Sequence, residues 1–154
     1  MPYVSTYFSP KRGAADTLIG FIDRCETSID AAVYSLTHDN IAAALIRAHE
    51  RGVKVRILTD KTQAGSRYAD DELLESKGIP LLRDRKTGSM HNKFIIGDNN
   101  AVGTGSFNWT ASADQRNAEN FVIIRLKYIV EEFQDEFEHL WEINTPEEVL
   151  SETV

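Results

Sequence analysis

Polar side chains of the kind that attack and hold a phosphate gather in one stretch of this chain. His91 and Lys93 come first, and Ser106 and Asn108 follow after an apolar run and a turn. A neutral imidazole is a nucleophile, whereas an ammonium, an amide and a hydroxyl can hold the anionic oxygens of a phosphate ester. The stretch therefore predicts a site for attack on a phosphate ester.

Each of these residues has a candidate role. His91 is the candidate nucleophile, because a free imidazole has a pKa of about 6.5 and is mostly neutral at pH 7. Lys93 and Asn108 are the candidate ligands of the phosphoryl oxygens, as a charge and as an amide donor. Ser106 is a further candidate donor, although a turn hydroxyl bonded to its own backbone is the alternative. Glu119 is predicted to accept the second ring N–H of His91 and to stabilise the imidazolium as it forms.

Other residues near this stretch are expected to shape it. Asp98 falls in the turn-forming run Gly97-Asp98-Asn99-Asn100, on the opposite side of the pleat from His91, and is predicted to be structural. Gly105 permits either close approach of the backbone to a ligand or a bulge. Trp109 is either a platform for a base or a core aromatic. Tyr34 and Ser35, which end a predicted strand, are expected to face the site.

The elements that must position these side chains follow from the apolar pattern. Strands are predicted at residues 4–8, 28–35, 53–59, 79–82 and 120–125. Two further strands are predicted, one before and one after the turn that follows Ile96. Helices are predicted from a Ser9 cap with Pro10 at the first helical position to about residue 25, and at 38–51, 70–77 and 128–143. This order predicts the α/β class, with one mixed central sheet and helices on both faces. We expect one domain over residues 1–154, with a loose tail from about 145.

Charge is distributed unevenly along the chain. The net charge is −7, yet residues 129–154 hold nine acidic groups and no Lys or Arg, which leaves +2 on the remainder. Basic residues precede and enter the motif at Arg83, Arg85, Lys86 and Lys93. Because local potential governs the encounter with a polyanion, a weak basic approach to the site is expected, with ordinary solvated charges as the alternative.

Several function classes are disfavoured by composition. No apolar run approaches the roughly 20 residues of a membrane span, so no stable membrane association is expected. The N-terminus lacks a secretion signal, which predicts a cytoplasmic protein, or a periplasmic or secreted one if the chain is a trimmed mature form. Cys25 is the only cysteine and is expected to be buried. The histidines do not form metal-ligand spacing with Asp or Glu, so neither a metal nor another cofactor is expected.

The spacing His-x-Lys-x4-Asp-x6-Gly-Ser-x-Asn, from His91 to Asn108, resembles the signature of the phospholipase D superfamily at every defined position. Further segments resemble its small bacterial endonucleases: Tyr-Phe-Ser-Pro, Ala-Val-Tyr-Ser-Leu-Thr, Arg-Gly-Val-Lys-Val, Gly-Ile-Pro and Asn-Ala-Glu-Asn. The resemblance also assigns Asp98 a structural place and a downstream Glu, here Glu119, to the site.

The resemblance implies a metal-independent, sequence-nonspecific endonuclease that acts on DNA, with RNA as a further substrate, through a phosphohistidine at His91. Because the motif occurs once, it also implies a homodimer with a shared active site. Two alternatives remain: a phospholipase D-type enzyme that hydrolyses phosphatidyl lipids or cardiolipin, and the catalytic domain of a larger restriction-type nuclease.

Overall fold

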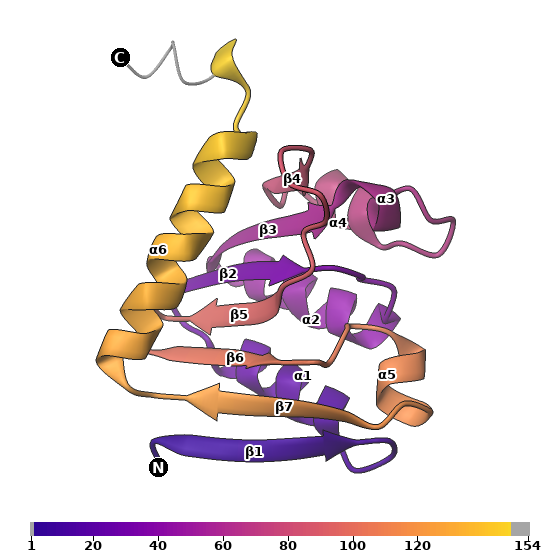
Figure 1. Cartoon of the computed structure of the whole chain (residues 1–154), viewed down its shortest axis with the longest axis vertical. Coiled ribbons are helices and arrows are strands. Elements are labelled where there is room, and N and C mark those ends of the chain that lie inside the picture. Colours follow the sequence, from indigo (N-terminus) through magenta and orange to yellow (C-terminus); the bar gives the residue numbers. More distant parts are fainter. Residues whose placement is uncertain (1, 149–154) are drawn as a thin grey trace.

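A computed structural model describes residues 2–148 and arranges them around one seven-stranded sheet (Figure 1). The strands are β1 (Val4–Ser9), β2 (Ser28–Val33), β3 (Lys54–Asp60), β4 (Leu81–Asp84), β5 (Lys93–Gly97), β6 (Ala101–Gly105) and β7 (Glu119–Ile124). The helices are α1 (Ala14–Arg24), α2 (Asp39–Glu50), α3 (Lys61–Ala64), α4 (Asp71–Ser76), α5 (Ala111–Gln115) and α6 (Lys127–Asn144).

The sheet is mixed, with the strand order β1-β7-β6-β5-β2-β3-β4. The strands β2, β3 and β4 are parallel, because helical crossovers connect them. The other neighbours, including the central pair β2 and β5, are antiparallel. The turn between β5 and β6 has positive φ at Asp98 and Asn99, 52° and 55°, as the two central residues of a type I′ turn require, and the N–H of Asn100 donates to the carbonyl of Gly97 at 3.0 Å.

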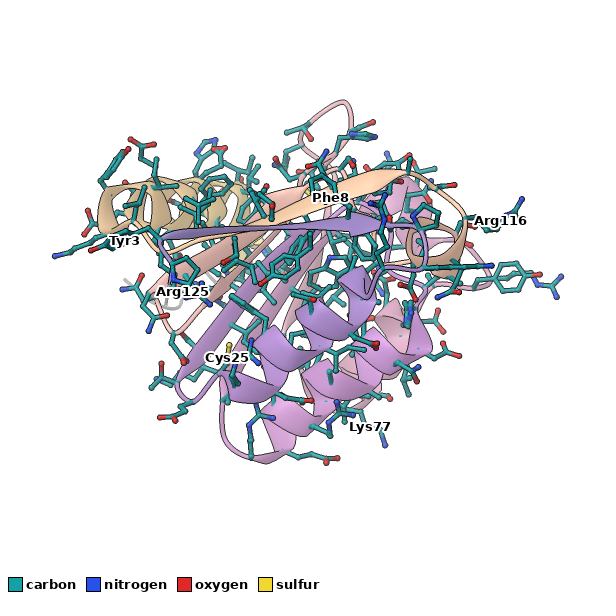
Figure 2. All side chains as sticks on the ribbon, turned by 90° about the horizontal axis from the view of Figure 1, so that it is seen from below. Tyr3, Phe8, Cys25, Lys77, Arg116 and Arg125 are labelled. Atoms are coloured by element: carbon teal, nitrogen blue, oxygen red, sulfur yellow. The ribbon has the colours of Figure 1, made fainter. Side chains whose placement is uncertain are left out.

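Helices cover both faces of the sheet, which confirms the predicted fold class. The helices α1, α2 and α4 pack on one face, and α6 packs on the other; Figure 2 shows α6 across the sheet from α1 and α2. Successive residues of β5 serve opposite cores, with Ile95 in the α1–α2 core and Phe94 and Ile96 in the α6 core. This burial on both faces explains why the strand is apolar without alternation.

The first helix begins later than the sequence predicts. It begins at Ala14, after Gly13 in the left-handed conformation with φ 79°, so the predicted cap at Ser9 is wrong. Ser9 instead ends β1 opposite Glu119, and its buried hydroxyl donates to the carbonyl of Asn117 at 3.0 Å. The Ser9 hydroxyl thus bonds the segment just before β7, and it does not cap a helix.

The other predicted elements are present, with ends shifted by a residue or two. The short helices α3 and α5 were not predicted, because helices of four and five residues are too short to show an apolar period. In α6, Phe137 and Leu140 are buried, while Ile129, Phe133 and Trp141 are partly buried against the same core, as predicted. Of the predicted tail, Thr145 donates its hydroxyl to the carbonyl of Trp141 at 2.7 Å, and residues 149–154 lie outside the described residues.

Candidate phosphate-ester site

The predicted site residues meet where the ends of β5, β6 and β7 lie side by side. In an antiparallel ladder the start of one strand lies beside the end of the next, so the start of β5, the end of β6 and the start of β7 converge. A pocket of about 550 Å³ opens there, lined by His91, Asn92, Lys93, Thr104, Gly105, Ser106, Asn108 and Glu119. The structure therefore brings together residues up to 28 positions apart in the sequence.

His91 and Lys93 are in direct contact. The Lys93 ammonium lies 2.8 Å from Nδ1 of His91 and donates to the His91 carbonyl at 2.7 Å. Burial lowers the pKa of Lys93, and the negative charge of Glu119 partly opposes this effect. An ammonium has only donors, so in this arrangement Nδ1 of the imidazole is the acceptor.

Tyr34 packs against both of these groups. Its ring centroid is 4.5 Å from that of His91, with the planes inclined at 49°, and the Lys93 ammonium lies 5.3 Å from the Tyr34 ring. The expectation that Tyr34 faces the site is confirmed. The contact with Lys93 is a cation–π interaction, which further restricts where the ammonium can lie.

Ser106 and Glu119 form a second pair in the pocket. The Ser106 hydroxyl donates to Oε1 of Glu119 at 2.7 Å and accepts the backbone N–H of Asn120 at 3.1 Å. The other carboxylate oxygen of Glu119 accepts from the Asn117 amide at 3.3 Å. The carboxylate thus bonds Ser106 and Asn117 rather than the His91 ring, although each of its oxygens retains a lone pair for a further donor.

The Asn108 amide is oriented by the backbone. The N–H of Ser35 donates to Oδ1 of Asn108 at 3.3 Å, which leaves the NH₂ group as the end that can donate into the pocket. The neighbours Phe107 and Trp109 are each 1% exposed, and they anchor the segment in the core. Trp109 is therefore a core aromatic, and it is not accessible for stacking on a base.

Asp98 lies at the opposite end of β5 from His91. Its carboxylate accepts the backbone N–H groups of Glu26, Thr27 and Ser28 at 2.7–3.2 Å, and also the Thr27 hydroxyl at 3.0 Å. Partial burial raises the pKa of Asp98, but these hydrogen bonds outweigh it and hold the pKa below its ordinary value. The carboxylate thereby fixes the entry of β2 beside the β5–β6 turn.

Gly105 is required by a close approach within the protein. A Cβ at this position would lie 2.2 Å from the carbonyl oxygen of Asn120, at a φ of 154°. The space next to Gly105 is thus occupied by the β7 backbone. The sequence analysis missed two pocket residues: Asn92, which lies between His91 and Lys93, and Thr104, which pairs with Phe94 across β5 and β6.

The basic residues before the motif divide into two kinds. Arg83 forms an ion pair with Glu75 at 2.5 Å, so its charge is largely compensated. Arg85 and Lys86 line a separate hollow of about 300 Å³ at the end of α6, and no ion pair holds them within residues 2–148.

In the described part of the chain, no three His, Cys, Asp or Glu side chains are grouped to hold a metal ion. None of the helices within residues 2–148 is long and apolar enough to cross a membrane.

Fold and pocket together define an α/β protein with a candidate phosphate-ester site at the converging ends of antiparallel strands. Residues 18–141 match the family described as "Cardiolipin synthase, PLD-like domain". The crystal structure of Nuc from Salmonella typhimurium, a phospholipase D family member, superposes with a TM-score of 0.87 at 35% identity, covering 92% of this chain and 95% of Nuc. The chain therefore belongs to the phospholipase D-like family, a family of phosphodiesterases.

Curated relatives carry two names. A phospholipase D from Rickettsia felis is 42% identical over 84% of this chain, and a mitochondrial cardiolipin hydrolase from Xenopus tropicalis is 34% identical over 95% of it. The chain spans 65% and 66% of the length of these relatives. NucT from Helicobacter pylori, with a TM-score of 0.81 at 22% identity, shares the fold.

Proposed function

We propose that this protein is a metal-independent endonuclease without sequence preference, which hydrolyses phosphodiesters through a phosphohistidine. The observation that carries the proposal is one pocket lined by an imidazole, an ammonium, an amide, a hydroxyl and a carboxylate, in which Lys93 contacts His91 and Ser106 donates to Glu119. The nearly complete overlap with Nuc supports it. Phosphate contacts carry no base information, which agrees with a lack of sequence preference.

The chemistry has two displacements. A ring nitrogen of His91 attacks phosphorus, the P–O bond to the leaving oxygen breaks, and an imidazolium donates a proton to that oxygen. Water then attacks the phosphohistidine, its proton passes to the second imidazole, and the P–N bond breaks. Lys93 and Asn108 hold the phosphoryl oxygens in both steps.

Attack through Nε2 requires the ring proton on Nδ1, where Lys93 cannot accept it. We infer that Glu119 accepts a hydrogen bond from that Nδ1–H when substrate phosphate draws Lys93 away. Ser106 then donates either to Glu119 or to a phosphoryl oxygen.

One copy of the motif supplies one imidazole, whereas the mechanism needs a nucleophile and a general acid. We therefore propose a homodimer with the site on its twofold axis, in which His91 of the partner subunit is the acid. An isologous interface brings the same residue of each subunit together across the axis. Two facing imidazoles would then titrate as a coupled pair.

Lipid phosphodiester hydrolysis is the second candidate, because the curated relatives are named phospholipase D and cardiolipin hydrolase. Plasmid, single-stranded DNA, RNA, phosphatidylcholine and cardiolipin should be offered to the protein in EDTA. Cleavage of the nucleic acids alone supports the endonuclease. Release of phosphatidic acid without cleavage of any nucleic acid would replace it with the lipid enzyme.

The intermediate can be trapped directly. A phosphoramidate hydrolyses in acid and survives base, so labelled phosphate should remain on wild-type protein after an alkaline quench, and should not remain on His91→Ala. A chiral phosphorothioate should be cleaved with retention, because two in-line displacements restore the configuration. Inversion without a base-stable adduct would mean direct attack by water, with His91 as a general base.

A further inference from the structure

We propose that Asp60 is a positioning residue for His91: its single buried carboxylate fixes both the loop that presents the imidazole and the aromatic ring that packs against it. The inference rests on the proposed function of His91. Asp60 is the last residue of β3 and is only 6% exposed. Within residues 2–148 no ion pair compensates its charge, so backbone donors must do so.

The first connection runs to the residue before the nucleophile. Oδ1 of Asp60 accepts the backbone N–H of Met90 at 3.1 Å, and the Met90 side chain is 2% exposed. His91 itself precedes β5, whose ladder begins at Lys93, so sheet hydrogen bonds do not hold the His91 backbone. The bond from Met90 to Asp60 therefore anchors the N-terminal side of His91.

The second connection runs to the ring that packs on His91. Oδ2 of Asp60 accepts two backbone N–H groups in the first turn of α3, at 3.0 and 3.2 Å. From that turn the Gln63 amide donates to the Tyr34 hydroxyl at 3.2 Å. The Tyr34 ring in turn lies 4.5 Å from the His91 ring, centroid to centroid. One carboxylate thus sets two of the contacts that determine where the imidazole lies.

A carboxylate is required here because both of its ends accept. Asp60→Asn keeps the shape but gives one end an NH₂ group. If that NH₂ faces α3, it meets two N–H donors; if it faces Met90, it meets another. Either orientation breaks one of the two connections, and the imidazole gains freedom.

Asp84 provides a matched control. It lies opposite Asp60 at the end of the adjacent strand β4, is 3% exposed, and accepts the N–H and hydroxyl of Thr87 and the amide of Asn144. None of these bonds leads to Met90 or to Tyr34. Asp84→Asn should therefore cost stability of similar size without moving His91.

The test combines kinetics on bis(p-nitrophenyl) phosphate with NMR of the His91 ring protons, which the nearby Tyr34 ring shifts by its ring current. In Asp60→Asn we expect kcat to fall on the order of 10- to 100-fold, the scale for misplacing a reacting group by about 1 Å, with KM nearly unchanged. The ring-current shift of His91 should shrink at the same time. Asp84→Asn should retain both the shift and kcat.

Two further variants isolate the α3 arm. Gln63→Ala and Tyr34→Phe each remove the hydrogen bond between α3 and the ring, so each should move the His91 resonances while the protein stays folded. If Asp60→Asn does not fold, an unmoved His91 resonance in both of these variants overturns the proposal. A folded Asp60→Asn with wild-type kcat and His91 shifts also overturns it, as does equal loss of kcat in Asp84→Asn. If the wild type hydrolyses no phosphodiester, the proposed function fails, and the NMR comparison still decides the role of Asp60.

Discussion

Asp98 allows a sharp separation between a structural and a catalytic motif residue. We expect Asp98→Asn and Asp98→Ala to lower the stability of the fold, with the larger loss in Asp98→Ala. Turnover of the folded protein should be nearly unchanged in both. The carboxylate binds three backbone N–H groups at the entry of β2, at the far end of β5 from His91. It therefore holds two chain segments together without touching the pocket.

The magnitudes follow from what each substitution keeps. Asn tolerates the φ of 52° and can present one oxygen to the same donors, so mainly the charge is lost, at a cost of about 1 kcal/mol after allowing for solvent screening. Ala loses every hydrogen bond and adds about 1 kcal/mol of backbone strain at positive φ, for a total of about 3 kcal/mol. At about 2–4 °C per kcal/mol for a chain of this size, Tm should fall by about 2–4 °C for Asn and about 6–12 °C for Ala.

The effect has a defined pH dependence. The pKa of Asp98 is lower in the folded protein than its ordinary value of 3.8, so its charge stabilises the fold above that pH, and the contribution is lost as pH falls through the lowered pKa. The difference in the free energy of unfolding between wild type and Asp98→Asn should therefore be constant near neutrality. It should decrease as the pH falls below about 4. Urea unfolding across pH, together with kcat below the transition, measures both. Loss of turnover in folded Asp98→Asn would refute the structural assignment.

Four other predictions concern the pocket. Lys93→Ala and Asn108→Ala should each lower kcat on the order of 10²-fold, the scale for one lost oxyanion contact, with Tm little changed; a loss confined to KM would contradict the assignment. Glu119→Gln removes the charge that raises the pKa of Lys93, so the alkaline limb of the kcat profile should move to lower pH; a shift to higher pH would be the wrong sign. Activity should survive EDTA, and loss that Mg²⁺ restores would contradict the mechanism. Mixing His91→Ala chains with wild type should reduce activity below simple dilution, as a shared site requires; strict proportionality would indicate independent subunits.

The sequence by itself determined the residue types and spacing of the motif and most of the secondary structure, and it predicted the chemistry of the site. The spacing from His91 to Asn108 indicated five of the pocket residues, His91, Lys93, Gly105, Ser106 and Asn108, because a strand-turn-strand unit keeps its partners close in sequence. The uninterrupted apolar run Phe94-Ile95-Ile96 likewise indicated a strand buried on both faces, as the two cores confirm. These features depend on local periodicity, which sequence carries directly.

Local signals failed where a residue's polar groups had a distant partner. Ser9 followed by Pro10 has the pattern of a helix cap, yet the Ser9 hydroxyl bonds Asn117, 108 residues away. Gly105 permitted either ligand approach or a bulge, and only the position of the Asn120 carbonyl decided that the close contact is with β7.

Only the tertiary structure decided how the imidazole is held. Nothing in the local pattern around Asp60 distinguishes it from an ordinary helix cap, since its bond to Met90 spans 30 residues. That bond exists because the end of β3 and the loop before β5 lie at the same end of the strands. The contact of Tyr34 with His91 has the same origin, because β2 and β5 pair antiparallel and so bring the end of one strand beside the start of the other. Residue types fix which groups can react, whereas strand order and register fix which groups meet, and register depends on pairing energies summed over the whole sheet.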